Sequence, residues 1–518
     1  MKKNKRWFMF ISLMLVCVLL ISACSGEDGA TPSTDAPGED VKEVRDEIKV
    51  RINSDPDFLD PHLATASISF QMILNMFEGL LSPNTDGSLK PAIAESFELS
   101  DDGLTYTFNI RDNVTFHNGE PVTVEDIQYT FERLMGTNSG EPLSSNFDKV
   151  ASMEAPDADT FVITLTEPNT NFLYSLTALE AAIVPASNDD QHNDNPIGTG
   201  PFKFVSYSPG VDLVLEKNED YWNAELPHLN KVTFAFQSDD QSALMALQAG
   251  EYDLTSVPAH RIPEVENDFK LEYQQNNSSL IITFNEENKP FDDVKVRQAV
   301  NFALSKSDII DSVYSGYATE LGSNMSPAMG KFYLEGLQDT YVNDIEKAKE
   351  LLAEAGYPDG FKTKLTVSSH NVMYTNVAQV AAENLKQIGI DVEIDVVEWG
   401  IWLDRVYRGR DYEMTAIDLT GRPSAYDILN DYISTNDAEN FFRFNNAEFD
   451  QVMADVLLEP DVEKQVALYQ RAQEILAEEA AAVYIADYQV VWAMDSALEG
   501  FNMYPFFFLD MSELRFTE

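Results

Sequence analysis

The sequence predicts an α/β fold, because the spacing of its apolar residues changes along the chain between that of strands and that of helices. In residues 105–110 (TYTFNI), apolar and polar residues alternate, which is typical of a strand with one buried face. In residues 343–361, apolar residues recur every three or four positions, as they do on one face of a helix. A strand, a helix and a second strand then follow one another over residues 364–396. This order predicts a βαβ unit and therefore parallel sheet.

The chain begins with the features of a secretory signal. Lys2, Lys3, Lys5 and Arg6 stand without a balancing acid, and an apolar run covers residues 7–23. The run is shorter than the roughly 20 apolar residues that span a membrane, and it ends on small residues. We therefore predict a signal peptide over residues 1–23.

Cys24 directly follows this apolar run. Residues 21–24 (ISAC) resemble the lipobox of bacterial lipoproteins, which implies cleavage before Cys24 and diacylation of its thiol. A retained membrane span and an ordinary core cysteine are the alternatives. Residues 24–47 are rich in Gly, Pro, Ser, Thr and acids, so we predict a disordered acidic tether there. A diacyl group supplies two chains, which suffices for stable anchoring to a membrane.

Composition excludes several classes of function. The other cysteine, Cys17, would leave with the signal, so a disulfide scaffold, a thiol redox site and a cysteine zinc site are excluded. The formal net charge of −52 repels nucleic acid, and we expect no nucleic-acid partner. The six histidines are scattered, and neither a G-x-x-x-x-G-K-[ST] loop nor a G-x-S-x-G elbow is present. The sequence therefore predicts no catalytic residue, no metal site, no cofactor and no enzyme.

Local signals place several elements. Asn118 and Gly119 indicate a turn, and Thr123 with Asp126 predicts a capping box before a helix. Asn343 is predicted to cap the next clear helix, which has an apolar face and a stop at Gly356. A strand is predicted over residues 364–369, and a helix follows it and ends at Gly389. The last strand, residues 390–396, is predicted to place four residues on one face: Ile390, Val392, Ile394 and Val396.

Several blocks in sequence order carry a family resemblance. The longest is residues 91–134, and it is accompanied by shorter blocks at 59–61, 77–80, 197–204, 218–223, 246–254, 284–304, 348–361 and 385–399. Together they resemble the extracytoplasmic solute-binding proteins of family 5, the dipeptide/oligopeptide-binding type that serves ABC importers. The resemblance covers residues 48–518.

The resemblance implies an architecture and a set of partners. The fold would be a two-lobed periplasmic-binding-protein-like fold (type II, cluster C) with an additional third domain. Lobe I would comprise residues 45–77, 187–272 and 489–518, the extra domain II residues 78–186, and lobe III residues 273–488. A small solute would bind between the lobes, which close by hinge motion. A monomer held by its lipid on the extracytoplasmic face of the cell membrane would deliver this solute to an ABC permease.

Residues 396–432 are the predicted centre of ligand binding, because they follow a strand end and combine aromatic side chains with four arginines within 18 residues. The alternative for Arg405, Arg408 and Arg410 is a solvated helix face on which they pair with neighbouring acids. Residues 276–279, which precede a strand predicted at 281–285 (IITFN), are expected to line the cleft as well. The predicted ligand-binding residues are Asn277, Ser278, Trp399, Trp402, Arg405, Arg408, Asp418, Arg422, Tyr426 and Asp427.

One position departs from the pattern of the peptide-binding relatives, which carry a Trp and an Asp that receives the peptide's α-ammonium. Leu419 and Arg422 stand at about those positions here. An arginine cannot receive an ammonium, and it suits a carboxylate or a phosphate instead. Either Asp418 or Asp427 receives the amine, or the ligand is not an ordinary peptide. If Arg422 binds an anionic ligand, the substitution Arg422→Ala weakens that binding.

Other motif residues are predicted to be structural. Arg111, Arg297 and Asp126 are expected to pack or cap, and Tyr221 and Trp222 to lie in a core outside the cleft. The leading function is capture of a peptide or peptide-like solute for import. A sugar, metal chelate, glutathione-like or other anionic solute in the same role is the alternative. A surface hydrolase and a signalling receptor are the rivals from other classes.

Overall fold

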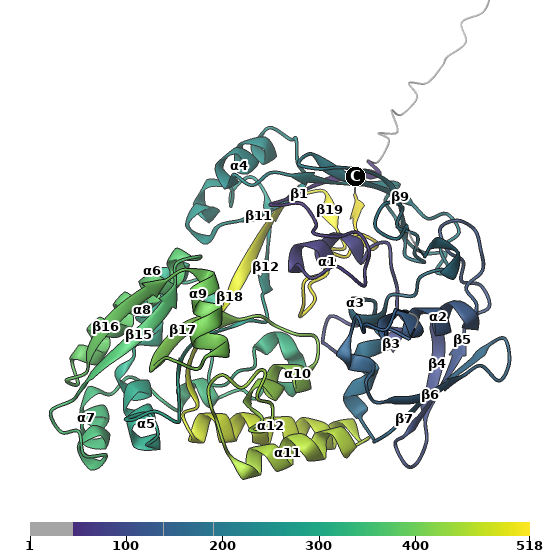
Figure 1. Cartoon of the computed structure of the whole chain (residues 1–518). Coiled ribbons are helices and arrows are strands. Elements are labelled where there is room, and N and C mark those ends of the chain that lie inside the picture. Colours follow the sequence, from purple (N-terminus) through teal and green to yellow (C-terminus); the bar gives the residue numbers. More distant parts are fainter. Residues whose placement is uncertain (1–44, 138, 190, 518) are drawn as a thin grey trace, which may run out of the picture. The chain divides into compact units, whose positions relative to one another are not determined.

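The computed structural model describes residues 45–517 except 138 and 190 (Figure 1). The predicted signal peptide, the lipidation residue Cys24 and nearly all of the predicted tether lie outside these residues. The tether was predicted to reach residue 47, but Arg45 already makes ion pairs with Asp253 and, at 3.0 Å, with Asp495. Within the described residues, no helix is both long enough and apolar enough to cross a membrane.

The protein has the predicted mixed α/β architecture. A sheet of 12 strands runs in the order β16-β15-β17-β13-β18-β11-β1-β10-β9-β8, with β12 and β14 also paired to β18. A separate sheet of four strands has the order β4-β5-β7-β6. We keep the names lobe I, domain II and lobe III for the three predicted sets of residues, whose boundaries remain a prediction.

Lobe I contains one half of the large sheet. The strands of lobe I in this sheet are β1 (Glu47–Ile52), β8 (Phe202–Ser208), β9 (Asp212–Lys217), β10 (Lys231–Phe236), β11 (Leu254–Val257) and β12 (Lys270–Gln275). Strands β19 (Leu498–Glu499) and β20 (Arg515–Phe516) form a separate two-stranded sheet. The helices of lobe I are α1 (Ser67–Ile73) and α4 (Asp240–Gln248).

Domain II contains the four-stranded sheet. The strands of this sheet are β4 (Ala94–Leu99), β5 (Thr105–Ile110), β6 (Val150–Glu154) and β7 (Thr160–Leu165). Domain II also has a two-stranded sheet of β2 (Leu81–Pro83) and β3 (Leu89–Pro91), and its helices are α2 (Val124–Leu134) and α3 (Ala178–Ala181). Tyr106, Phe108 and Ile110 of β5 are buried, as their alternation predicted. The capping box of α2 is confirmed, since Thr123 Oγ1 accepts from Asp126 N at 3.4 Å and Asp126 Oδ2 accepts from Thr123 N at 3.1 Å.

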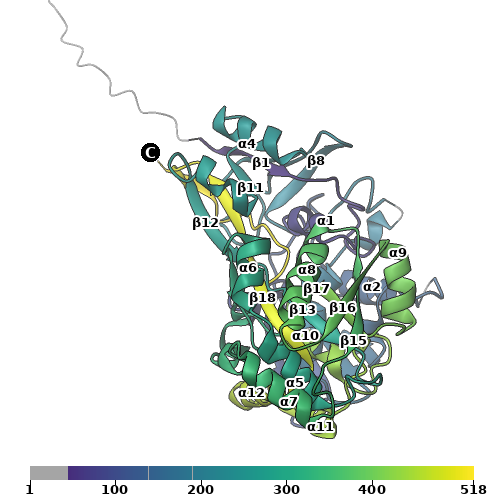
Figure 2. The ribbon, with the colours of Figure 1, turned by 90° about the vertical axis from the view of Figure 1, so that its left-hand side faces the viewer.

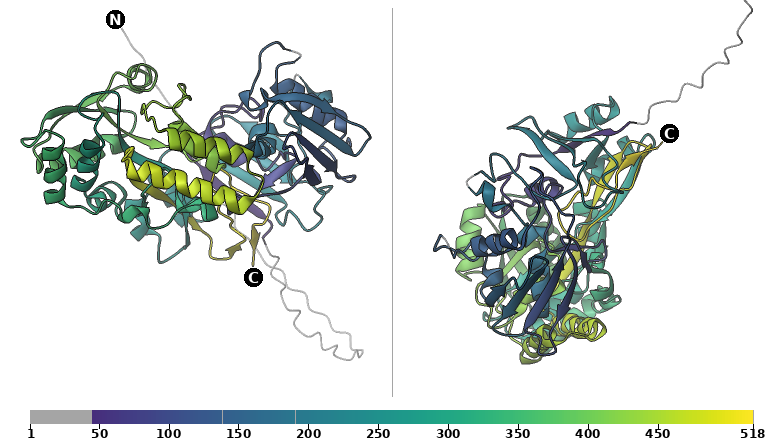
Figure 3. Two further views of the ribbon diagram at one scale, coloured as in Figure 1. Left: turned by 90° about the horizontal axis from the view of Figure 1, so that it is seen from below. Right: turned by 90° about the vertical axis from the view of Figure 1, so that its right-hand side faces the viewer.

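Lobe III contains the other half of the large sheet and most helices. Its strands are β13 (Ser279–Phe284), β14 (Ala318–Glu320), β15 (Lys362–Ser368), β16 (Asp391–Val397), β17 (Met414–Leu419) and the first part of β18 (Ala482–Met494). Its helices are α5 (Val294–Ala303), α6 (Lys306–Tyr314), α7 (Ile345–Glu354), α8 (Val372–Lys386), α9 (Trp399–Trp402), α10 (Ala425–Leu429), α11 (Ala447–Leu458) and α12 (Val462–Glu478). Helices α11 and α12 lie side by side along the lower face (Figure 3).

The predicted βαβ unit is present in lobe III. Strand β15 pairs in parallel with β16 and also with β17, and α8 connects β15 to β16. One detail of the prediction is wrong. The cap of α7 is Asp344, whose side chain accepts from Lys347 N at 2.9 Å, while Asn343 instead donates to Ala303 O at 3.0 Å. Val392, Ile394 and Val396 alternate along β16 as predicted, and the first two pack against the core while Val396, near the end of the strand, is exposed.

Two chain segments connect the lobes. Strand β18 is long enough to belong to both, since its first part pairs with β13 and its last part with β11 and β12 (Figure 2). The second connection runs from β12 to β13 through residues 276–278. Asn276 N donates to Tyr488 O at 3.2 Å and joins the two connections side by side. A pair of adjacent connections of this kind is where a hinge between two lobes is expected.

Candidate functional site

The ends of four neighbouring strands in lobe III gather most of the predicted ligand-binding residues. Because β15, β16 and β17 are parallel, their carboxyl ends meet at one edge of the sheet, where ligand groups of α/β folds collect. His370 follows β15, Trp399 follows β16, and Arg422 follows β17. The antiparallel strand β13 begins at the same edge, with Ser279 opposite Leu419. We call this edge the cleft edge.

An apolar surface forms one part of the cleft edge. Trp399 is 40% exposed, and its ring lies 4.5 Å from that of His370. It stacks at 5.2 Å and 8° on Trp402, which is only 2% exposed and donates from Nε1 to Thr415 Oγ1 at 3.0 Å. Val372 and Ile401 are exposed as well. Trp402, predicted to contact ligand, is therefore a core residue in this structure, and it supports Trp399 from beneath.

Arg405 and Arg408 form ion pairs with neighbouring aspartates and do not lie among the other predicted residues. Arg405 Nη2 donates to Asp395 Oδ2 at 2.7 Å, and Arg408 Nη1 donates to Asp404 Oδ1 at 2.5 Å. The pair of Arg408 with Asp404 matches the alternative of a solvated helix face, whereas the partner of Arg405 lies on strand β16. The geometry gives no support for a ligand contact by Arg408, whereas Arg405 lines an open cavity of about 560 Å³ together with Thr366.

Asp418, at the end of β17, has an incompletely satisfied carboxyl group. Its Oδ1 atom is buried and has no hydrogen-bond partner among the described residues. Burial, together with the neighbouring charge of Asp487, raises the pKa of Asp418 to about 7, although a hydrogen bond from Ser278 lowers it. The rings of Tyr314 and Tyr488 stack 5.6 Å apart near this carboxyl group, and burial together with the charge of Asp418 raises the pKa of both tyrosines. A buried carboxyl group with an open acceptor and no cation of its own can receive a ligand's ammonium group.

Asn277 and Ser278, also predicted to bind ligand, lie in the hinge segment. Asn277 is buried with a φ of 53°, and its Nδ2 donates to Arg422 O at 3.0 Å and to Pro505 O at 2.6 Å. The backbone N–H groups of Asn277 and Ser278 both donate to the buried carboxylate of Asp487 at 3.1 Å. Burial raises the pKa of Asp487 to about 6, although these hydrogen bonds lower it. Asn277 therefore fixes the hinge against the loop that carries Arg422.

A small polar cavity adjoins this segment. It holds about 10 Å³, and Arg422 and Asp431 are among its lining residues. Ser279 Oγ and Asn324 Oδ1, which also line it, are buried and lack a hydrogen-bond partner among the described residues. The volume and the polar lining suit one bound water molecule.

Arg422 is engaged by protein acceptors. Its Nη1 donates to Asp427 O at 2.8 Å and to Asp431 Oδ1 at 3.1 Å, and its Nη2 lies 3.7 Å from Glu439 Oε2. Burial raises the pKa of Asp431 to about 7, and the charge of Arg422 lowers it. An anionic ligand would have to displace these acceptors.

Domain II meets lobe III close to Arg422. Asn171 Nδ2 donates to Asp427 Oδ1 at 3.0 Å, and Ser424 Oγ donates to Asn171 Oδ1. Glu180 accepts from Asn146 Nδ2 at 2.7 Å, and burial together with the charge of Asp427 raises its pKa to about 7. Tyr426, on α10 beside Asp427, is half-buried. Sequence reasoning missed Glu180 and Asn171, since no local pattern marks a residue that approaches from another domain.

The motif residues predicted to be structural have clear packing roles. Arg297 is buried and donates to Phe291 O at 2.9 Å and to Glu479 O at 2.8 Å. Arg111 donates from Nε to Ala92 O at 2.6 Å and stacks over Trp222 at 4.3 Å. Tyr221 and Trp222 are only half-buried, because they line a cavity between lobe I and domain II.

Comparison with known proteins decides the family. Residues 88–440, more than half of the chain, match the family model described as bacterial extracellular solute-binding proteins, family 5. The chain belongs to this family. The predicted family membership and the predicted fold class are thus confirmed.

Family 5 relatives match over nearly the full length. The oligopeptide-binding protein OppA of Bacillus subtilis is 28% identical, with 96% of this chain and 97% of the relative covered. The glutathione-binding protein GsiB of Pectobacterium atrosepticum is 29% identical, with 89% of this chain and 92% of the relative covered. A solved structure of the ABC transporter-associated periplasmic binding protein DppA from Helicobacter pylori in complex with the peptide STSA has a TM-score of 0.74 and 26% identity, and covers 92% of this chain and 99% of that chain.

Proposed function

We propose that this family 5 protein is a lipid-anchored receptor that captures a peptide or peptide-like solute with a free amino group and delivers it to an ABC permease. The observation that carries the proposal is the carboxyl group of Asp418, which is unpaired among the described residues. Its carboxyl group lies at the cleft edge, has an open acceptor atom and has no cation paired with it among the described residues. The peptide-binding and glutathione-binding relatives support the class of solute.

The remaining features of the cleft edge fit a peptide. The exposed ring of Trp399 offers an apolar contact to the side chains of a ligand. Acids outnumber bases where domain II meets lobe III, since Glu180, Asp427, Asp431 and Glu439 surround Arg422. This imbalance favours a ligand with positive charge, and it disfavours the anionic solute that Arg422 alone suggests.

Calorimetry with paired peptides tests the role of Asp418. A short apolar peptide with a free amino terminus is compared with its N-acetylated form, on the parent protein and on Asp418→Asn. We expect acetylation to weaken binding at least tenfold in the parent protein, because a buried charge-assisted hydrogen bond is lost. In Asp418→Asn the two peptides should bind equally weakly. Asp450→Asn, a substitution of another lobe III carboxyl that accepts from Ser434 N at 2.9 Å, serves as the matched control.

Two outcomes contradict the proposal. Equal affinity of the parent protein for the free and acetylated peptides would exclude an ammonium site. A preference for the free peptide that survives in Asp418→Asn would move the ammonium site to another carboxyl, with Asp427 as the next candidate.

The lipid anchor has a separate test. Cys24→Ser removes the thiol that would carry the diacyl group. We expect the variant to lose partition into a detergent phase, in which the parent protein, produced in a bacterial host, is recovered. Equal partition of the two proteins would refute the anchor and leave the binding proposal untouched.

A further inference from the structure

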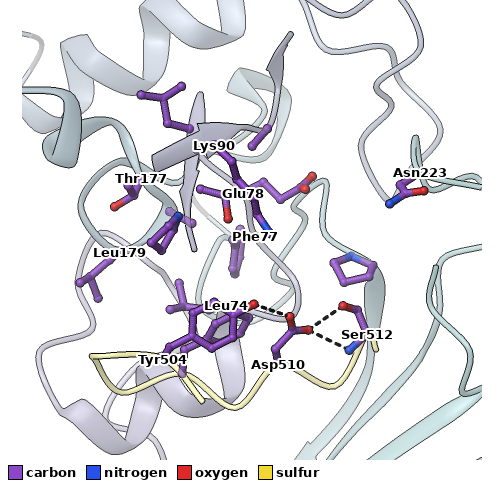
Figure 4. Close-up of a pocket in the computed structure, with 18 of the residues that line it drawn as sticks. Leu74, Phe77, Glu78, Lys90, Thr177, Leu179, Asn223, Tyr504, Asp510 and Ser512 are labelled. Atoms are coloured by element: carbon purple, nitrogen blue, oxygen red, sulfur yellow. Dashed lines mark hydrogen bonds between the residues drawn. The ribbon is translucent and has the colours of Figure 1, made fainter. Parts of the chain in front are cut away.

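A second cavity lies between lobe I and domain II (Figure 4). It holds about 270 Å³ and is bounded by the chain around Phe77 and Glu78, by strands β2 and β3, by residues 177–179 and by the C-terminal segment 504–513. None of the ten predicted ligand-binding residues lines it. The volume is close to the lower end of the roughly 300–1,000 Å³ typical of small-molecule sites.

Aromatic rings make up much of the cavity wall. Tyr504, Phe506 and Phe508 of the C-terminal segment pack on one another, with ring centroids 5.0 Å apart for Tyr504 and Phe508 and 6.2 Å apart for Phe506 and Phe508. Tyr221 and Trp222 contribute a second pair of rings, 5.4 Å apart. Aromatic faces of this kind attract both apolar groups and organic cations.

Two carboxyl groups face this cavity, and neutral donors hold both in place. Glu78 accepts from Tyr221 Oη at 2.8 Å, from Trp222 Nε1 at 3.0 Å and from Thr199 Oγ1 at 3.0 Å. Asp510 accepts from Tyr504 Oη at 2.8 Å and from Ser512 Oγ at 2.6 Å (Figure 4). Burial raises the pKa of Glu78 to about 7, so its charged form gains from a nearby cation.

The charge balance of the lining is negative. Glu78, Asp510 and Glu513 line the cavity together with a single basic residue, Lys90. Lys90 is exposed to solvent, and no ion pair joins it to these acids within the described part of the chain. The lining therefore combines apolar walls with acids that form no ion pair among the described residues, although the charge of Arg111, which stacks over Trp222, also acts on Glu78.

We propose that this cavity is a second binding site, for a compact organic cation with an aromatic or apolar body and one ammonium group. The body packs against the rings of the C-terminal segment, and the ammonium group approaches Glu78 and Asp510. An uncharged molecule of the same shape gains only the apolar contact, and an organic anion meets repulsion from the acids. The cavity touches the loop of Arg422 only through Pro423, and none of the predicted ligand-binding residues lines it. The proposal does not depend on the proposed peptide receptor function.

Calorimetry on the full chain tests the site with 2-phenylethylamine and, as the uncharged control, 2-phenylethanol. We expect the amine to bind at least tenfold more tightly than the alcohol. Glu78→Gln should reduce this preference at least fivefold. Because Glu78→Gln also disturbs the hydrogen bonds of Tyr221 and Trp222, a second variant is needed. Leu179→Trp adds a bulky ring at the cavity wall, leaves Glu78 intact and should abolish binding of both probes.

Asp418→Asn separates this site from the cleft edge. If the amine occupies the second cavity, its affinity is unchanged in Asp418→Asn. Equal affinity for amine and alcohol, or unchanged amine binding in Leu179→Trp, would overturn the proposal. Loss of amine binding in Asp418→Asn with retention in Leu179→Trp would overturn it as well, and would place the probe at the cleft edge.

Discussion

Replacement of Arg297 by alanine tests whether this family-motif arginine is structural. Its side chain is only 5% exposed and lies between α5 and the end of α12. Its guanidinium group donates to Phe291 O and Glu479 O at 2.9 and 2.8 Å and lies 3.2 Å from Glu286 Oε2. In Arg297→Ala, two carbonyl groups lose their donors, and Glu286 keeps a buried carboxyl group without a partner.

The expected loss of stability is large. Each of the two carbonyl groups that loses its charged donor costs about 1–3 kcal/mol, so we expect a total loss of about 2–6 kcal/mol. Glu286 adds little to this loss at pH 7, because burial raises its pKa to about 8 and keeps its carboxyl group mostly neutral. Urea unfolding at pH 7 measures the change through the midpoint at constant slope. The matched control is Arg408→Ala, whose side chain is 66% exposed and pairs only with Asp404, so we expect a change of about 0.5 kcal/mol or less.

The affinity of Arg297→Ala for peptide is measured as the second readout of this experiment. If Arg297 is structural, Arg297→Ala binds peptide as the parent protein does, at a temperature where both are folded. A loss of stability below about 1 kcal/mol together with weakened peptide binding would refute the structural role.

Three further predictions concern other parts of the molecule. The free energy of unfolding should fall as the pH rises from about 6.5 to 8, because burial raises the folded-state pKa of several carboxyls above their unfolded values, so that the folded protein holds protons which the unfolded chain has released. These carboxyls, whose pKa is raised to about 7 or 8, are Asp418, Asp431, Glu180, Glu78 and Glu286. Below this range, His62 and His117 oppose the trend, because burial lowers the pKa of each to about 4. Urea midpoints that stay flat or rise over this range would contradict the prediction. Trp399→Ala should weaken peptide binding by about 1–2 kcal/mol in calorimetry, whereas Trp402→Ala should chiefly lower stability, by about 3–5 kcal/mol in urea, and the reverse pattern would contradict these roles. Arg422→Ala should lower stability by about 1–3 kcal/mol, because Asp431 loses its partner. The affinity for an anionic peptide should be unchanged, and a clear loss of that affinity would show that Arg422 binds ligand.

Local patterns in the sequence predicted the elements well. The alternation of β5, the capping box of α2 and the βαβ order of β15, α8 and β16 all depend on neighbouring residues, and all are observed. The cap of α7 was misplaced by one residue, because Asn343 and Asp344 are both good cap residues and only the contact of Asn343 with Ala303 separates them.

The site was harder to predict, because its properties depend on residues distant in sequence. The raised pKa of Asp418 comes from burial in the folded protein and from the charge of Asp487, which lies more than 60 residues away in the sequence. Arg422 looked like an anion-binding residue until Asp431 and the backbone of Asp427 were seen to engage its donors. Aromatic composition alone also could not separate the exposed Trp399 from Trp402 beneath it.

The identity of the natural ligand tests the central claim most directly. The protein can be purified from its host without added ligand, denatured, and the released small molecules analysed by mass spectrometry. The account predicts short peptides or peptide-like molecules with free amino groups. Recovery of a single sugar, metal chelate or other solute without an amino group would contradict it.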